Sequence, residues 1–295
     1  MRLAFKLATF AVVGLALASA FLAENALHIW NRPAADGGAA DAVARQGGAS
    51  WRAVQITAED GARLDAWLFT PREGNGAGVI LLHGIADTRM GMSGHAPWLL
   101  RAGYTVLLPD SRGHGASGGE IITYGIREAG DVHRWADLLL REQGVTRLFG
   151  IGQSMGAAIL LESLPGEPRF RAVVADCPFA TFEEVAYDRM VQHGPRVRGA
   201  YWPVVNLGFL YARARYGVDL WHASPADAIR ATHTPVLLIH GAADSNIPPR
   251  HSRELRAINP ASTELWEVPR AGHVASLGTE PAAYRRRVIA WFTRY

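Results

Sequence analysis

The pentapeptide Gly-Gln-Ser-Met-Gly at 152–156 constrains the fold more than any other stretch of the chain. An apolar run at 148–151 precedes it and reads as a short buried strand, and residues 155–164 read as a helix. A G-x-S-x-G sequence between a strand and a helix is typical of a sharp turn that lifts the serine hydroxyl clear of the sheet. Ser154 is therefore a candidate nucleophile, although the same pentapeptide also occurs where a serine only caps a helix.

Strand-like and helix-like segments alternate along residues 51–295, which we assign to one domain. Two segments joined by a turn at 59–61 predict an opening hairpin. The alternation predicts an α/β fold with a mainly parallel sheet, helices on both faces and the hairpin at an antiparallel edge. The predicted strands are 53–57, 64–70, 78–82, 105–108, 148–151, 172–175, 236–239 and 264–268, and the predicted helices are 97–101, 126–141, 155–164, 250–258 and 281–293.

One segment, 181–221, interrupts this alternation. It is rich in aromatic residues, contains no strand-like run and is too long for a simple connection. We expect a small helical cap over the carboxyl edge of the sheet. An elongated crossover is the alternative.

The N-terminal segment is apolar. Arg2 and Lys6 precede an unbroken run of apolar or small residues at 7–23, about the minimum length that crosses a bilayer. The positive flank predicts an N-terminus in the cytoplasm and a catalytic domain outside it. We assign residues 1–24 to a retained membrane anchor or to a signal peptide, which would leave the chain secreted or periplasmic; a buried core helix is a third possibility.

Two Ala-x-Ala patterns, at 16–18 and 18–20, would suit cleavage of a signal peptide. The apolar run is long for a signal core and continues past both patterns, which favours the anchor. Residues 25–50 are rich in Ala, Gly and Asp and predict a linker.

Composition excludes several classes of protein. The net charge is only +3, and no basic run with interleaved aromatic residues indicates a nucleic-acid partner. The single cysteine, Cys177, excludes an intrachain disulfide. The eleven histidines are scattered, and no Cys/His cluster has zinc spacing. The oligomeric state is left open.

A serine hydroxyl needs a base within hydrogen-bond reach, and the base needs an orienting carboxylate. In sheets of this type, such groups collect after the carboxyl ends of strands. Asp244 follows the predicted strand 236–239, and His273 follows the predicted strand 264–268. The chain order Ser154, Asp244, His273 is the order expected for a nucleophile on this kind of turn.

Two other residues compete for these roles. Asp176 also ends a predicted strand, and it would orient the histidine if Asp244 did not. His251 lies inside a predicted helix and is a weaker candidate for the base.

An ester or amide substrate also needs hydrogen-bond donors for the oxyanion. The backbone N–H of Met155, next to Ser154, is one candidate. The loop after the predicted strand 78–82 reads His83-Gly84-Ile85, and we assign the second donor to the Ile85 N–H. Gly84 lets this backbone approach closely, and His83 is expected to organise the loop.

Four motifs together resemble those of α/β-hydrolases, and the resemblance covers residues 51–295: His-Gly at 83–84, the sequence DSRGHGAS at 110–117, GQSMG at 152–156, and the pair HGAAD and AGH at 240–244 and 271–273. The second motif is similar to a turn of the serine-aminopeptidase-like and lysophospholipase-like branch. There, Arg112 and His114 would be structural. The resemblance implies a serine hydrolase without a metal or organic cofactor.

The N-terminal apolar segment is similar to that of membrane-anchored members of this superfamily. The single glycine after His83 differs from the HGGG run of hormone-sensitive-lipase-like esterases. No single activity follows from the resemblance.

We therefore expect a small-molecule hydrolase that cleaves a carboxylic ester or thioester with an apolar acyl group through an acyl-Ser154 intermediate. Hydrolysis of amides or peptides is an alternative, in which Glu183, Glu184 and Asp188 would hold an amine. A non-catalytic binding module with this fold is another, against which the complete set of three residues argues.

Overall fold

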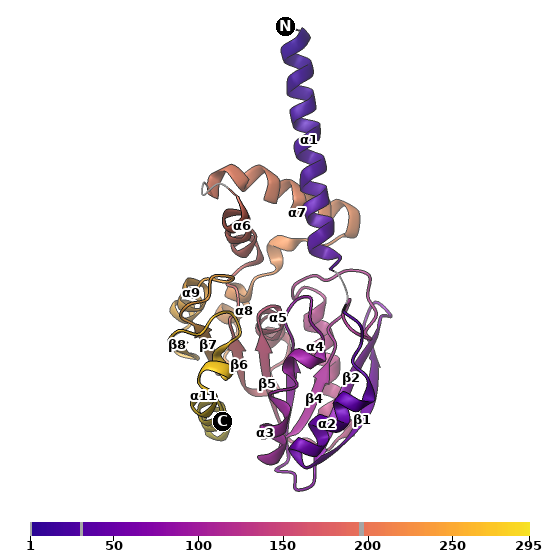
Figure 1. Ribbon diagram of the computed structural model, residues 1–295, viewed down its shortest axis with the longest axis vertical. Helices are drawn as coiled ribbons and strands as arrows, with labels where there is room; N and C mark the ends of the chain where they lie inside the picture. The colour runs from indigo at the N-terminus through magenta and orange to yellow at the C-terminus, as the bar shows by residue number, and fades with distance from the viewer. Residues whose placement is uncertain (1, 30–31, 195–197) are drawn as a thin grey trace.

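In the computed structural model, residues 2–29, 32–194 and 198–295 are described, and their strands form one eight-stranded sheet in the order β1-β2-β4-β3-β5-β6-β7-β8 (Figure 1). β2 is antiparallel to both of its neighbours, and the remaining pairs are parallel. The α/β class and the antiparallel opening hairpin are thus confirmed. The strands are β1 Ala49–Thr57, β2 Arg63–Pro71, β3 Ala77–Leu82, β4 Thr105–Pro109, β5 Arg147–Gln153, β6 Phe170–Asp176, β7 Val236–Gly241 and β8 Thr263–Val268.

Helices cover both faces of the sheet because each central strand is apolar on both sides. In β3, Val79 and Leu81 join one hydrophobic core, and Ile80 and Leu82 join the other. The first core includes α2 Gly37–Gly47, α3 Ala96–Arg101 and α11 Pro281–Arg294. The second includes α4 Glu128–Asp137, α5 Met155–Ser163, α8 Pro225–Ala231 and α9 Arg250–Ile258.

Shorter elements complete these layers. The helix expected at 126–141 is divided, because a π-helical turn, η2 Leu138–Glu142, follows α4. The others are η1 Arg89–Met92, η3 Leu164–Gly166 and α10 Ser276–Thr279.

The segment expected to form a cap is helical where the structure describes it. It contains α6 Phe182–His193, η4 Arg198–Tyr201, α7 Trp202–Tyr216 and η5 Leu220–His222. Figure 1 shows α6 and α7 above the sheet, beside the N-terminal helix.

The prediction of a linker at 25–50 is wrong for most of its length, because α2 occupies its centre and β1 begins at Ala49. The Asp36 side chain accepts a hydrogen bond from the Ala39 N–H, which caps the helix, and Gly48 ends it in the left-handed conformation (φ 67°). Ala40, Val43, Ala44 and Gly47 are buried at helical spacing. These small side chains let α2 pack closely on α3, so an Ala/Gly-rich composition here indicates a packed helix.

The N-terminal helix α1, Arg2–Leu27, projects away from the domain (Figure 1). Its segment Phe5–Leu27 is long and apolar enough to cross a membrane, as an anchor or a signal segment would require. Most of its side chains are exposed, but Ser19, Ala23 and Leu27 near its end are buried.

Glu162, on α5, leads to a prediction about stability. Its Oε1 is buried and has no hydrogen-bond partner among the described residues. Burial, and then the charges of Glu128 and Asp227, raise the pKa of this carboxyl to about 9. A carboxyl whose pKa is higher in the folded state stabilises the fold fully only below its unfolded pKa, and this contribution is lost as the pH rises toward the folded pKa.

We therefore expect Glu162→Gln to gain stability relative to the wild type as the pH rises from about 5 to about 9. Urea unfolding at several pH values in that range measures the difference. A difference that stays constant with pH would contradict the raised pKa.

Candidate active site

Ser154 lies on a strained turn between β5 and α5, with φ 55° and ψ −120°. A Cβ added at Gly152 would overlap the Gly156 carbonyl, and one added at Gly156 would overlap the Leu82 carbonyl at the end of β3. The Ser154 N–H donates to the Asp176 carbonyl at 2.8 Å, which ties the turn to β6. Both flanking glycines are therefore required by close backbone contacts.

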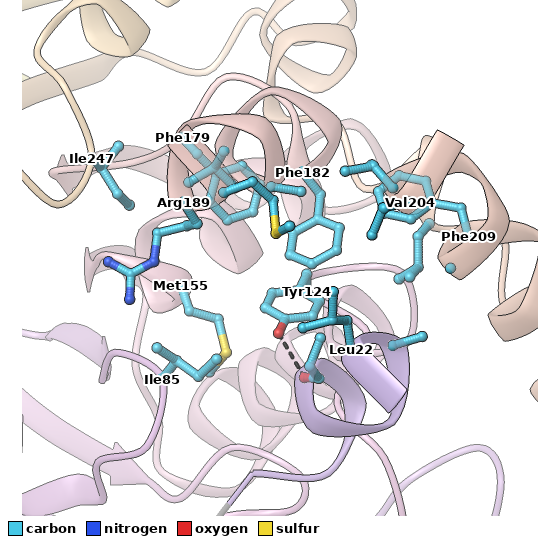
Figure 2. Close-up of a pocket in the computed structure, with 18 of the residues that line it drawn as sticks. Leu22, Ile85, Tyr124, Met155, Phe179, Phe182, Arg189, Val204, Phe209 and Ile247 are labelled. Atoms are coloured by element: carbon cyan, nitrogen blue, oxygen red, sulfur yellow. Dashed lines mark hydrogen bonds between the residues drawn. The ribbon is translucent and has the colours of Figure 1, made fainter. Parts of the chain in front are cut away.

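The Ser154 side chain borders an apolar cavity of about 320 Å³. Residues of α6, α7 and the end of α1 line it, and Figure 2 shows Phe182, Phe209 and Leu22 among them. Tyr124 stacks on Phe182 with ring centroids 3.8 Å apart, and Phe182 stacks on Phe209. Among the described residues that line the cavity, Arg189 is the only charged one, and its guanidinium donates to the Asn246 side chain.

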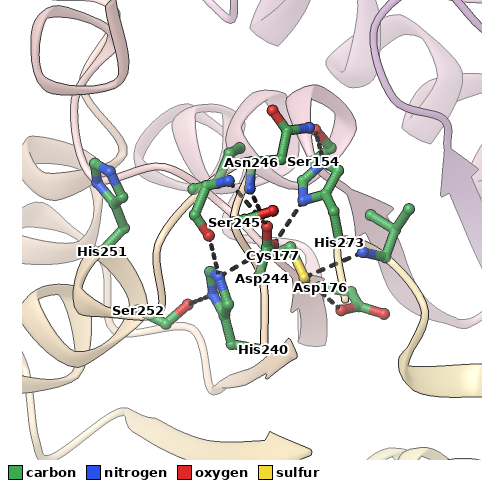
Figure 3. A network of polar contacts seen from close by, with 12 residues as sticks. Ser154, Asp176, Cys177, His240, Asp244, Ser245, Asn246, His251, Ser252 and His273 are labelled. Atoms are coloured by element: carbon green, nitrogen blue, oxygen red, sulfur yellow. Dashed lines mark hydrogen bonds and ion pairs between the residues drawn. The ribbon is translucent and has the colours of Figure 1, made fainter. Parts of the chain in front are cut away.

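The three residues predicted to act together meet beside this cavity, and Ser154 is the one that borders it. His273 Nε2 lies 2.9 Å from Ser154 Oγ, and His273 Nδ1 lies 2.7 Å from Asp244 Oδ2 (Figure 3). Asp244 follows β7 and His273 follows β8. In the tautomer with its proton on Nδ1, the imidazole donates to the carboxylate, and its Nε2 faces the serine hydroxyl as an acceptor. This arrangement can remove the serine proton.

The Asp244 carboxyl is held as an anion. Its Oδ1 accepts hydrogen bonds from the backbone N–H groups of Asn246 (2.8 Å) and Ile247 (3.0 Å). Burial alone would raise the pKa of Asp244, but the hydrogen bonds from His240, His273 and the backbone outweigh it and hold the pKa well below its usual range. The carboxylate can therefore stabilise a positive charge on His273 at neutral pH.

His240 is a member of this network that the sequence analysis did not assign. It is fully buried, with Nε2 2.8 Å from the Ile247 carbonyl and 3.4 Å from Asp244 Oδ2, and with Nδ1 2.7 Å from Ser252 Oγ. The one feature of the sequence that pointed to His240 was its position four residues before Asp244. The side chain supports the Asp244 loop from below.

The alternative carboxylate, Asp176, points elsewhere. Its Oδ1 lies 3.2 Å from Ser276 Oγ and 3.3 Å from Cys177 Sγ. Burial raises the pKa of Asp176 to about 6. The geometry around the imidazole therefore favours Asp244 as its partner.

The alternative base, His251, is occupied by other contacts. Its Nδ1 accepts from the Ala180 N–H at 3.1 Å, and its Nε2 lies 2.9 Å from Asp188 Oδ2. These contacts join α9 to the region of α6.

The loop expected to supply an oxyanion donor lies beside Ser154, because β3 and β5 are neighbours and Leu82 pairs with Gly152. A Cβ added at Gly84 would lie 3.4 Å from Ser154 Cβ. The loop that carries Ile85 thus passes next to the nucleophile. Met155 is in the first turn of α5, where backbone N–H groups have no partner within the helix.

His83 shapes this loop, as expected. Its Nδ1 lies 2.8 Å from the Gly84 carbonyl, and its Nε2 accepts from the Ser111 N–H at 3.0 Å. Burial, and then the neighbouring His114, lower the pKa of His83 to about 4, so the ring is neutral near pH 7.

The DSRGHGAS loop is held by ion pairs. Arg112 Nε and Nη2 donate to Asp131 at 2.8 and 2.7 Å, and Nη1 donates to Asp60 at 2.7 Å. Asp110 accepts from Arg89 Nη2 at 2.5 Å. These contacts link the loop to α4, to the turn of the β1–β2 hairpin and to η1, consistent with a structural role for Arg112.

Cys177, Asp244 and His273 form a cluster of residue types that bind metals, with their ligand atoms within 4.8 Å of one another. Burial, and then the Asp176 charge, raise the pKa of the Cys177 thiol far above its usual range, which disfavours the thiolate that metals prefer. The contact of His273 with Asp244 on one side and with Ser154 on the other accounts for this cluster.

Comparisons with known proteins identify the family. Residues 75–208 match the family model for serine aminopeptidase S33. The chain is 30% identical over 218 residues to the protein YqkD of Bacillus subtilis, covering 71% of this chain and 69% of that protein. It is 27% identical over 252 residues to YfhR of Escherichia coli K12, covering 81% and 80%.

A solved structure of the Pyrococcus furiosus esterase Pf2001 superimposes with a TM-score of 0.70 at 26% identity, covering 90% of this chain and 97% of that one. The chain belongs to the α/β-hydrolase superfamily, in the serine aminopeptidase S33 family, and is a hydrolase.

The two buried aspartates can be separated by substitution. We expect Asp244→Asn to slow ester hydrolysis by about 10³-fold or more, because the amide cannot hold the required tautomer or stabilise the imidazolium. Asp176→Asn should cost less than about tenfold, because the described hydrogen bonds of the Asp176 carboxyl are to Ser276 and Cys177.

Steady-state kinetics, with thermal unfolding of each variant as a check of folding, make this comparison. Equal losses for the two variants, or the larger loss for Asp176→Asn, would contradict the assignment.

Proposed function

We propose that this hydrolase cleaves carboxylic esters or thioesters with apolar acyl groups through an acyl-Ser154 intermediate. The supporting observation is the single line of contacts from Asp244 through His273 to Ser154, which ends at an apolar cavity. The nucleophile, the base that takes its proton and a site for the acyl group thus lie together at the carboxyl ends of the strands.

The reaction would proceed in two stages. His273 Nε2 takes the Ser154 proton as Oγ forms a bond to the carbonyl carbon, and the N–H groups of Ile85 and Met155 donate to the oxyanion. The bond to the alcohol or thiol breaks, and His273 returns the proton to that leaving group. His273 then deprotonates a water molecule as its oxygen bonds to the acyl carbon. The bond from that carbon to Ser154 Oγ breaks, His273 gives the proton to Oγ, and the acid and free Ser154 are released.

The contacts of the acidic residues in α6 favour an ester over a peptide. Glu184 and Asp188 each accept a hydrogen bond from Arg250, at 2.5 Å. Glu183 accepts from the Tyr187 hydroxyl at 3.3 Å. No carboxylate lies among the described residues that line the cavity, so the amine anchor that an aminopeptidase needs has no counterpart there. The Pyrococcus furiosus relative is itself an esterase.

We also propose that α1 is a retained anchor, with the catalytic domain outside the cytoplasm. The support is its length of 26 residues and the cationic residues Arg2 and Lys6 at its start.

A panel of p-nitrophenyl esters with graded acyl lengths, run beside aminoacyl p-nitroanilides, tests this proposal. We expect ester turnover that Ser154→Ala reduces by about 10³-fold or more. An active-serine phosphonate should label the wild type and not this variant. Ser245 is an exposed serine on the Asp244 loop, so Ser245→Ala is the matched control. This variant should keep both the ester turnover and the phosphonate labelling.

Labelling that survives Ser154→Ala would count against the nucleophile. Turnover of the anilides alone would favour the peptidase alternative.

A further inference from the structure

The end of α1 is built into the catalytic domain. It packs on α7 at small residues, since a Cβ added at Gly208 would lie 3.2 Å from the Ser19 carbonyl and 3.7 Å from Ala23 Cβ. The two helix backbones therefore approach closely, as helices with small residues at their interface do. Ser19 is 1% exposed and Ala23 is 7% exposed.

Polar contacts hold the same turns of α1 in place. Glu24 Oε1 accepts hydrogen bonds from the hydroxyl groups of Tyr211 (2.6 Å) and Tyr216 (2.7 Å) on α7. The Tyr124 hydroxyl donates to the Ala26 carbonyl at 2.6 Å, as Figure 2 shows. The Ile122 N–H donates to the Leu27 carbonyl at 3.0 Å. This end of α1 is therefore part of the folded domain.

One face of α1 lines the cavity beside Ser154. The lining residues stand at positions i, i+3, i+4 and i+7, which places them on one side of a helix: Ser19, Leu22, Ala23 and Ala26. Leu22 is 40% exposed, and its neighbours Leu17 and Phe21 are each 67% exposed. The apolar wall of the cavity is thus continuous with the outer apolar surface of α1.

The length of α1 relates this cavity to the membrane. Crossing the hydrocarbon core takes about 20 residues, or about 30 Å of helix. Residues 2–18, which precede the part packed on α7, supply only about 25 Å at 1.5 Å per residue. A membrane-spanning α1 therefore brings its packed end, with α7, to the level of the membrane surface. Trp202 and Leu210 on α7 are 61% and 51% exposed, as suits an interfacial helix.

We propose that α1 is a permanent wall of the acyl site and that the substrate is a single-chain lipid ester drawn from the bilayer along this helix. This inference rests on the proposed function above. The cavity, at about 320 Å³, lies at the small end of the usual range for ligand sites, which suits one acyl chain. Its lining is apolar where the chain would lie, and its wall begins on a helix surrounded by lipid.

Two substitutions on α1 test the wall. In the full-length protein, Leu22→Trp places a larger ring in the cavity, and Leu17→Trp adds the same ring on the exposed surface. We expect Leu22→Trp to lower kcat/KM for p-nitrophenyl laurate about tenfold, the effect of losing contact with about two methylene groups. For p-nitrophenyl butyrate, which stays close to Ser154, the change should be within about twofold, and Leu17→Trp should change neither ester.

Two results would contradict the role of α1 as a wall. One is a laurate-to-butyrate ratio of kcat/KM that Leu22→Trp leaves unchanged, and the other is an equal change of this ratio in Leu17→Trp. If the proposed function itself were wrong, the result would differ, because hydrolysis of neither ester would then be reduced by Ser154→Ala. Binding keeps the wall testable even in that case. On the Ser154→Ala background, fluorescence titration with 11-(dansylamino)undecanoic acid should show Kd raised about tenfold by Leu22→Trp and not by Leu17→Trp.

Entry from the bilayer has its own test. The wild type is reconstituted into phosphatidylcholine vesicles, and monoolein is placed either in the same vesicles or in separate ones. We expect hydrolysis at least about tenfold faster when enzyme and lipid share a vesicle. Equal rates would overturn lateral entry. Intact mass of the chain recovered from membranes should include residues 2–18, and a chain that begins at Ser19 or Phe21 would overturn the permanent wall.

Discussion

The approach of α5 to the end of β3 is the contact on which the rest of the site depends. Gly156 has no side chain, so its backbone packs against the Leu82 carbonyl. This contact places the start of the helix, the serine turn and the following loop within a few ångströms of one another. The positive φ of Ser154 is the conformational cost, and the hydrogen bond of its N–H to β6 offsets part of it.

A polar chain, buried except at His273, extends from this turn along the carboxyl ends of the strands. It runs from Ser154 through His273 and Asp244 to His240 and Ser252, with each neighbouring pair 2.7 to 3.4 Å apart. Because every member has a partner, the desolvation of the carboxylate is compensated locally. The chain spans the loops after β5, β7 and β8 and a helix, α9, so several separate segments must fold correctly before the imidazole is oriented.

The sheet and the three polar residues could be predicted because their signals are local. Apolar runs such as 78–82 identify strands buried on both faces, and strand ends indicate where Asp244 and His273 must lie. Only coordinates could separate Asp244 from Asp176, because both follow strands and the choice depends on where each carboxyl points. His240 was missed because its one signal, a position four residues before Asp244, does not by itself distinguish a buried histidine from an exposed one.

The sequence did not predict helix α2, and it did not predict which face of α1 packs on the domain. Both failures have the same physical reason. In α2, alanines and glycines look like a linker, yet their small size is what allows close packing on α3. In α1, nearly every residue is apolar, so periodicity cannot distinguish the face buried against α7 from the rest. Hydrophobic pattern identifies a buried face only when the opposite face is polar.

The small-residue contact between α1 and α7 has a consequence for how this helix tolerates change. A generic tether accepts any apolar side chain at any position. Here one stripe, through Ser19 and Ala23, accepts only compact side chains because the backbone at Gly208 is so near. The tethering helix therefore cannot be exchanged for an arbitrary hydrophobic segment without opening the side of the domain that it closes.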